Sequence, residues 1–205
     1  MSTLSEGLAR HLSPEQLACL NSAHIGIAGV GGLGSNVAFM LARSGIRRLT
    51  LVDKDVVEAS NLNRQAYFPE HMGQPKVIAL SGELRRLEPE MKLVSRYETL
   101  IPETVLSRFS GCDAVVEALD DAPDKAMLYR IFVSTGIFIV CASGFGGWGG
   151  PPMSVRRLGE KAVLVGDGVS AVGSKLPPMA PRVVQAAAMQ ADAVLTFLLG
   201  EQQQE

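Results

Sequence analysis

Short apolar runs alternate with segments of helical periodicity between residues 23 and 145. The run at 24–29, HIGIAG, is apolar and ends in glycine, which is typical of a buried parallel strand. The segment at 33–44 has apolar residues at helical spacing and stops before Gly45, a helix-terminating signal. Further strands are predicted at 48–52, 91–96, 113–119 and 137–142, and further helices at 75–87, 102–109 and 123–133. This order predicts a doubly wound, Rossmann-like α/β fold with a mostly parallel sheet and helices on both faces.

The pattern changes after residue 142. Residues 143–152 form a glycine-rich loop, and 153–157 and 161–165 predict two short strands that extend the sheet antiparallel. Residues 181–199 predict a long helix that is apolar almost all round, so it must be buried in the core or against another subunit. Its polar exceptions are Arg182, Gln185, Gln190 and Asp192. We expect one domain over 1–205, with a partly helical leader at 1–22, a Rossmann-like core at 23–145, and a sheet extension with a closing helix at 146–205.

Composition argues against several classes of protein. The 205 residues hold 19 Lys and Arg against 21 Asp and Glu, a balance unlike that of nucleic-acid-binding proteins. No apolar run reaches the ~18 residues of a membrane span, and the N-terminus lacks a secretory signal pattern. Cys19, Cys112 and Cys141 form no C-x-x-C pair, which excludes a disulfide framework and a cysteine-rich zinc site. We therefore expect a cytoplasmic protein with no nucleic-acid or membrane partner.

Residues 29–34, GVGGLG, fit the pattern G-x-G-x-x-G between a predicted strand and a predicted helix. The glycines allow the backbone to turn tightly and to approach phosphates, whose charge then faces the helix N-terminus. Asp53 ends the second predicted strand, where its carboxylate can accept hydrogen bonds from ribose hydroxyls. These residues predict nucleotide binding, by default of NAD. The alternative is that the glycines serve only close packing of helix against strand.

Cationic residues after the second strand point away from NAD. Asn61 and Arg64 belong to the segment SNLNRQ at 60–65, which either caps a helix and is solvated or faces a triphosphate. Lys76 lies in the first turn of a predicted helix, where a cation opposes the helix dipole. A lysine in so unfavourable a place is a candidate for binding an anion.

Two adjacent carboxylates, Asp120 and Asp121, end the fourth predicted strand. Asp121 either caps the following helix, or the pair helps to bind Mg²⁺. Like the cationic residues, they fall at the carboxyl edge of the sheet, where open α/β folds bind ligands. Convergence of cations and a metal carboxylate beside phosphates favours phosphoryl or nucleotidyl transfer over hydride transfer.

Together these motifs resemble the ThiF/MoeB/HesA superfamily of ubiquitin-activating-enzyme-like adenylyltransferases. The resemblance extends from about residue 20 to 200, and SGFGGWGG at 143–150 followed by VLVGD at 163–167 resembles the short ThiF subgroup in particular. The matching segments are GVGGLGSN at 29–36, LVDKDVVEASNLNRQ at 51–65, GQPK at 73–76, ALDD at 118–121 and the closing segment at 180–200.

The resemblance implies ATP-dependent activation of the C-terminal Gly-Gly carboxylate of a ubiquitin-fold sulfur carrier, ThiS or a relative. The carboxylate would attack the α-phosphorus of ATP and give an acyl-adenylate and pyrophosphate. Thiamine thiazole synthesis is the pathway that the short ThiF subgroup suggests, and molybdopterin or cysteine routes use the same chemistry. The alternatives are a superfamily member that activates a tRNA-linked carboxylate, an NAD-binding oxidoreductase, and a non-catalytic nucleotide-binding module.

The resemblance also implies residue roles. Gly32 would lie against the phosphates, and Asp53 would hold the ribose. Asn61, Arg64 and Lys76 would surround the triphosphate, and Asp120 would bind Mg²⁺. Further nucleotide contacts are implied at Gly29, Gly31, Gly34, Asp55 and Asp121. The resemblance further implies a homodimer, in which Arg10 is the candidate for a leader arginine that reaches the partner subunit's ATP.

The sequence departs from longer relatives in its cysteines. Paired C-x-x-C zinc motifs are absent, and residues 142–205 contain no cysteine, so Cys141 is the sole candidate for a covalent intermediate. We therefore expect a separate sulfur-donor protein to supply sulfur, and no zinc.

Overall fold

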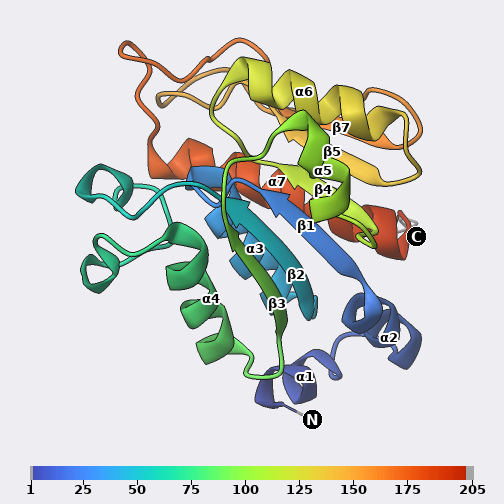
Figure 1. Ribbon diagram of the computed structural model, residues 1–205. Helices are drawn as coiled ribbons and strands as arrows, with labels where there is room; N and C mark the ends of the chain where they lie inside the picture. Colours follow the sequence, from blue (N-terminus) through green and yellow to red (C-terminus); the bar gives the residue numbers. More distant parts are fainter. Residues whose placement is uncertain (1, 202–205) are drawn as a thin grey trace.

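The computed structural model describes residues 2–201, which form one seven-stranded sheet with the order β3-β2-β1-β4-β5-β7-β6 (Figure 1). Each pair of neighbouring strands is parallel except β6 and β7. The strands are β1 His24–Ala28, β2 Arg48–Asp53, β3 Lys92–Tyr97, β4 Ala114–Glu117, β5 Phe138–Ala142, β6 Ser154–Arg157 and β7 Ala162–Gly166. The predicted α/β fold is confirmed.

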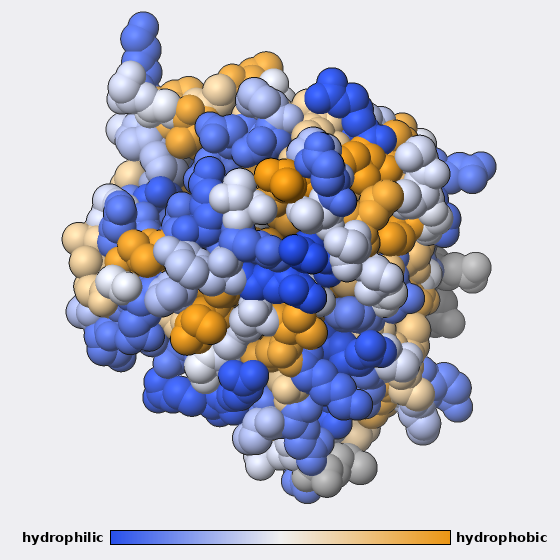
Figure 2. All heavy atoms as spheres, in the orientation of Figure 1, coloured by the Kyte–Doolittle hydropathy of each residue, from blue (hydrophilic) through white to orange (hydrophobic). Residues whose placement is uncertain are grey.

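Helices cover both faces of this sheet (Figure 1). One face carries α3 (Gly32–Arg43), α4 (Lys76–Leu87) and α7 (Ala180–Leu199), and the other carries α5 (Pro102–Arg108) and α6 (Ala122–Val133). Side chains of each strand alternate between the two faces, so both sides of the sheet contribute to a buried core. On the outer face shown in Figure 2, apolar residues form small patches among polar ones.

The C-terminal strands differ in direction. β7 pairs parallel with β5, and β6 lies outside β7 and pairs with it antiparallel. The predicted antiparallel extension is therefore confirmed for the β6–β7 pair, whereas β7 continues the parallel sheet. The reason is the path of the chain, because the loop after β5 leads first to the sheet edge, and a short turn then returns β7 alongside β5.

The long helix α7 packs along α3 and against β5. It is long and apolar enough to cross a membrane by length and composition alone, a test that core helices also pass. Its inward residues are buried, including the polar Arg182 and Gln190. The Gln190 side chain donates from Nε2 to the backbone oxygen of Glu117 at 2.8 Å. The predicted burial of this helix is confirmed for its inward face, and two of its polar residues face inward too.

The leader forms two short helices, α1 (Thr3–Leu8) and α2 (Pro14–Ser22), as predicted. Ser13 begins α2 with a capping box, in which its side chain accepts from the backbone of Gln16 and the Gln16 side chain accepts from the backbone of Ser13. Figure 1 shows both helices near the amino end of β1, opposite the loops that follow β1 and β2. The leader therefore lies away from the carboxyl edge of the sheet.

Candidate nucleotide site

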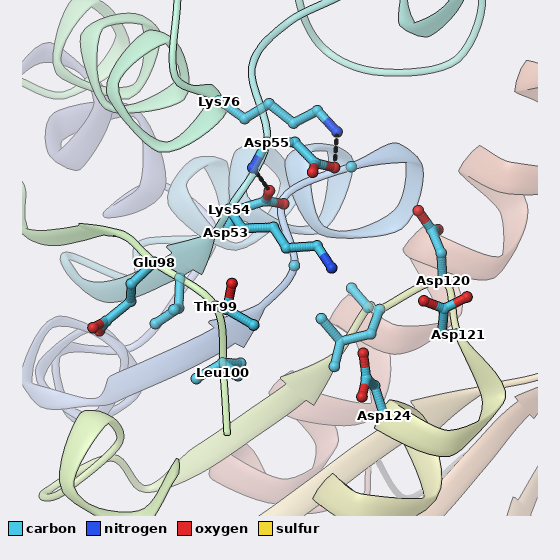
Figure 3. Close-up of a pocket in the computed structure, with 15 residues that line it drawn as sticks. Asp53, Lys54, Asp55, Lys76, Glu98, Thr99, Leu100, Asp120, Asp121 and Asp124 are labelled. Carbon is cyan, nitrogen blue, oxygen red and sulfur yellow. Dashed lines mark hydrogen bonds and ion pairs between the residues drawn. The ribbon is translucent and has the colours of Figure 1, made fainter. Parts of the chain in front are cut away.

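A cleft opens at the carboxyl ends of β1, β2 and β4 (Figure 3). We call it the main cleft, and two further pockets adjoin it. The polar side pocket includes Asn61, Arg64 and Lys76, and the apolar side pocket includes Gly32, Arg64 and Phe145. Asp120 lines all three. The main cleft is lined by Gly29, Gly31, Val52, Asp53, Lys54, Asp55, Lys76, Glu98, Thr99, Leu100, Ala118, Leu119, Asp120, Asp121 and Asp124.

The glycine turn between β1 and α3 forms one wall of the site. Gly29 has a φ of 87°, a conformation that favours glycine. A Cβ on Gly34 would lie 1.9 Å from the backbone oxygen of Gly29, so only glycine permits this close crossing of helix and strand. No side chain caps the N-terminus of α3. Its first amides thus face the site, as a phosphate-binding helix N-terminus requires.

Asp53 ties the end of β2 to the glycine turn. Its Oδ2 accepts a hydrogen bond from the backbone of Val30 at 2.7 Å, and its Oδ1 accepts one from the backbone of Asp55 at 2.8 Å. Burial raises the pKa of the Asp53 carboxyl, against the two amide donors, which favour the charged form. The two carboxylate oxygens thus hold the end of β2 against the start of the glycine turn.

Lys76 begins α4 and is buried, with 5% of its surface exposed. Its Nζ lies 2.8 Å from Oδ2 of Asp55, and its backbone N–H donates to the backbone oxygen of Asp55. This ion pair offsets the unfavourable position of a cation at a helix N-terminus. It also places the ammonium in the wall shared by the main cleft and the polar side pocket.

Arg64 lies between the two side pockets. Its Nη1 donates to the backbone oxygen of Ser60 and to Oδ1 of Asn63, both at 2.8 Å, which orients the guanidinium. Asn61 is buried, and its side-chain oxygen accepts from the backbone of Glu58. Arg64 is thus directed at the site, while Asn61 chiefly shapes the loop that carries it.

Asp120 and Asp121 are both exposed, and they line the main cleft opposite β2 (Figure 3). Asp121 occupies the N-cap position of α6 but makes no side-chain capping hydrogen bond. The capping alternative is therefore not observed, and both carboxylates face the cleft without a protein partner among residues 2–201.

Asp120 and Asp121 offer carboxylate oxygens, the kind of protein ligand that Mg²⁺ takes. No group of three or more His, Cys, Asp or Glu side chains that could hold a metal occurs within residues 2–201. Mg²⁺ commonly takes one or two carboxylates and completes its shell with substrate phosphates and water. Asp120, with Asp121 beside it, supplies that kind of partial shell.

Arg64, Lys76 and Asp120 thus gather around adjoining pockets, with the glycine turn and Asp53 beside them. Arg10 does not join them, because it lies in the exposed turn after α1. Cys141 is buried in β5, and burial raises the pKa of its thiol to about 12. A thiol with so high a pKa is a poor nucleophile near neutral pH.

The motifs did not single out several residues of the site. Lys54 and Asp124 line the main cleft, and Tyr67 donates from its hydroxyl to the backbone oxygen of Val30. A signal was available for Lys54, since it stands between two motif aspartates at the end of a predicted strand. Tyr67 and Asp124 carry no local pattern that indicates their positions.

A sequence model described as the ThiF family matches residues 5–205. The chain belongs to the ThiF family. This ThiF-family chain is 40% identical over 125 residues to the adenylyltransferase and sulfurtransferase MOCS3 of Bos taurus. The aligned region covers 60% of this chain and 28% of MOCS3. It is 34% identical over 143 residues to the tRNA threonylcarbamoyladenosine dehydratase of Haemophilus influenzae. That aligned region covers 69% of this chain and 55% of the dehydratase.

Solved structures share the fold. The Escherichia coli tRNA N6-threonylcarbamoyladenosine dehydratase TcdA, in complex with ATP, superposes with a TM-score of 0.87 at 23% identity, covering 95% of this chain and 93% of TcdA. E. coli MccB with ATP gives a TM-score of 0.72 at 21% identity, covering 89% of this chain and 58% of MccB. In sequence, the chain spans about half or less of the curated relatives named here. The resemblance is confirmed for the family, and these relatives do not single out its ThiS-specific branch.

Proposed function

We propose that this ThiF-family protein adenylates a carboxylate with ATP. The observation that carries the proposal is the convergence of Arg64, Lys76 and Asp120 on adjoining pockets at the N-terminus of α3. A cleft with cations, a metal-type carboxylate and free helix amides suits a nucleoside triphosphate. An oxidoreductase acting through NAD has no need for that set.

In the proposed reaction, an oxygen of the substrate carboxylate bonds to the α-phosphorus of ATP, and the bond from that phosphorus to the bridging oxygen breaks. Pyrophosphate takes the bonding electrons and leaves. Negative charge grows on phosphate oxygens, which Arg64 and Lys76 are placed to stabilise. Asp53 orients the ribose. Mg²⁺, held by Asp120, would add further neutralisation of the phosphates when bound.

One candidate substrate is the Gly-Gly carboxylate of a ubiquitin-fold sulfur carrier. The identity of 40% to MOCS3 over 125 residues supports it. The net charge of −2 also suits a protein partner better than a nucleic acid. A thiamine-specific route is one of several that use this chemistry, and a separate sulfur donor would follow the adenylation because Cys141 is buried.

The second candidate is a carboxylate linked to tRNA. The match to the Haemophilus influenzae dehydratase covers more of the chain than the match to MOCS3, 69% against 60%. The superposition on TcdA also extends over nearly the whole of both chains. These comparisons support a tRNA-linked carboxylate better than they support a ThiS-like carrier of thiamine synthesis.

Pyrophosphate exchange into ATP tests both substrates. The purified protein, with Mg²⁺ and labelled pyrophosphate, is given a panel of Gly-Gly-tailed carriers and, separately, tRNA bearing a threonylcarbamoyl carboxylate. Exchange with a carrier alone supports the carrier, and exchange with tRNA alone identifies the second candidate. Absence of exchange with every substrate, together with tight NADH binding, would reject adenylation.

The assignment of Arg10 depends on a second subunit. Arg10 is exposed and lies away from the main cleft of its own chain. We propose that a homodimer brings it to the partner's ATP. Inactive Arg10→Ala and Lys76→Met proteins are mixed in equal amounts under conditions in which subunits reassort. The mixture should then recover about a quarter of the wild-type rate of pyrophosphate exchange, averaged over all dimers. No recovery on mixing would remove this role.

A further inference from the structure

Lys54 stands between Asp53 and Asp55 at the end of β2. Its neighbours point toward the glycine turn and toward Lys76, respectively. Figure 3 shows the Lys54 side chain extending instead across the main cleft, toward the side formed by Asp120 and Asp121. Lys54 also lines the polar side pocket, so this residue borders both compartments.

Lys54 differs from the nearby lysines in having no partner. Lys76 pairs with Asp55 at 2.8 Å, and Lys125 pairs with the buried Glu117 at 3.1 Å. Lys54 makes no ion pair and no side-chain hydrogen bond with any residue in 2–201, and it is exposed. Its ammonium is therefore free to bind a ligand without first breaking an internal interaction.

The lining of the main cleft carries an excess of negative charge, which an unpaired cation at Lys54 reduces. Carboxylates outnumber ammonium groups on its lining, and Lys76 is already neutralised by Asp55. A nucleoside triphosphate brings several more negative charges into this space. The acidic lining residues are Asp53, Asp55, Glu98, Asp120, Asp121 and Asp124, and the basic ones are Lys54 and Lys76. An unpaired cation can take up part of this added charge without first giving up an internal partner.

We propose that Lys54 binds a phosphate group of the nucleotide from the end of β2. The inference rests on the proposed use of ATP and adds to it a contact that the motif residues do not supply. The four-carbon stem of lysine lets the ammonium follow the phosphate as the nucleotide settles, whereas Arg64 is held by Ser60 and Asn63.

Equilibrium binding of ATP, AMP and adenosine to wild type, Lys54→Met and Lys54→Arg tests the contact. Lys54→Met should weaken ATP binding about tenfold, the loss typical of one charge-assisted hydrogen bond, and should leave adenosine binding unchanged. Lys54→Arg should recover most of the ATP affinity. The defect should shrink as salt is raised, because exposed charges are screened.

Lys92→Met is the matched control, since Lys92 is also exposed and unpaired within residues 2–201. Lys92 begins β3, so it lies at the amino edge of the sheet, whereas Lys54 follows the carboxyl end of β2. It should bind ATP like wild type. Equal ATP affinity of Lys54→Met and wild type overturns the inference, as does an equal loss for ATP and adenosine, which would indicate a contact with the base. ATP binding that depends on Lys54, in a protein inactive with every carrier and tRNA, would uphold the contact and reject the proposed substrates. A wild-type protein that binds no ATP overturns both.

Discussion

The ammonium of Lys76 lies 2.8 Å from Oδ2 of Asp55, and the two partners differ sharply in exposure. The lysine side chain is 6% exposed, and the aspartate side chain is 46% exposed. Removing the aspartate therefore leaves a buried charge without its partner, while removing the lysine leaves a carboxylate that water can solvate.

Asp55→Ala should consequently reduce the free energy of unfolding by about 1–3 kcal/mol, the cost of an unsatisfied buried group. Lys76→Met should reduce it by less, yet should abolish pyrophosphate exchange. Urea denaturation measures the first effect and the exchange assay the second. Greater destabilisation by Lys76→Met than by Asp55→Ala would contradict the burial argument.

Gly34→Ala should prevent formation of the glycine turn. The added Cβ would lie 1.9 Å from the backbone oxygen of Gly29, and backbone atoms cannot move aside cheaply. Gly82 in α4 has nothing within 4 Å of an added Cβ, so Gly82→Ala is the control. It should stabilise the protein by about 0.5–1 kcal/mol. Thermal denaturation compares the two, and a Gly34→Ala protein as stable as wild type would disprove the close crossing.

Cys141→Ala should retain the rate of pyrophosphate exchange. Cys141 is 6% exposed, and the pKa of its thiol is about 12, so it holds almost no thiolate near neutral pH. Iodoacetamide should likewise leave Cys141 unmodified in the folded protein, as read by mass spectrometry. Loss of exchange in a folded Cys141→Ala protein would instead point to a covalent step.

Acid should weaken the fold through His24. Its Nε2 lies 2.9 Å from Oγ1 of Thr50, and burial lowers the pKa of the imidazole below its ordinary value of 6.5. The folded state thus favours the neutral ring, so this contribution to stability is complete above pH 6.5 and is lost as pH falls through the folded pKa. Urea denaturation at several pH values should show a shallower acid dependence for His24→Gln. An identical pH slope would show that His24 does not titrate in this way.

The sequence predicts the sheet well where the signal is local. Apolar runs that end in glycine or aspartate mark β1, β2 and β4, and helix termini follow from Gly45 and Pro181. The direction of β7 was not predictable in this way, because it depends on the path of the whole loop after β5. Local patterns predict where strands lie in the sequence more reliably than they predict which strands pair.

In the site too, local motifs predicted positions along the chain, whereas contacts between distant segments were not predicted. Motif spacing placed Arg64, Lys76 and Asp120 at one edge of the sheet, and the structure brings them to adjoining pockets. The Lys76–Asp55 pair joins residues far apart in sequence, so no spacing rule indicated it. That Lys54 forms no ion pair likewise depends on which side chains lie near it in the fold, so the sequence did not indicate it.

A crystal structure with ATP and Mg²⁺ tests the central claim most directly. The triphosphate should lie over the N-terminus of α3, within hydrogen-bond distance of Arg64 and Lys76, with the metal on Asp120. A nucleotide bound elsewhere, or a triphosphate that points away from these three side chains, would contradict the account.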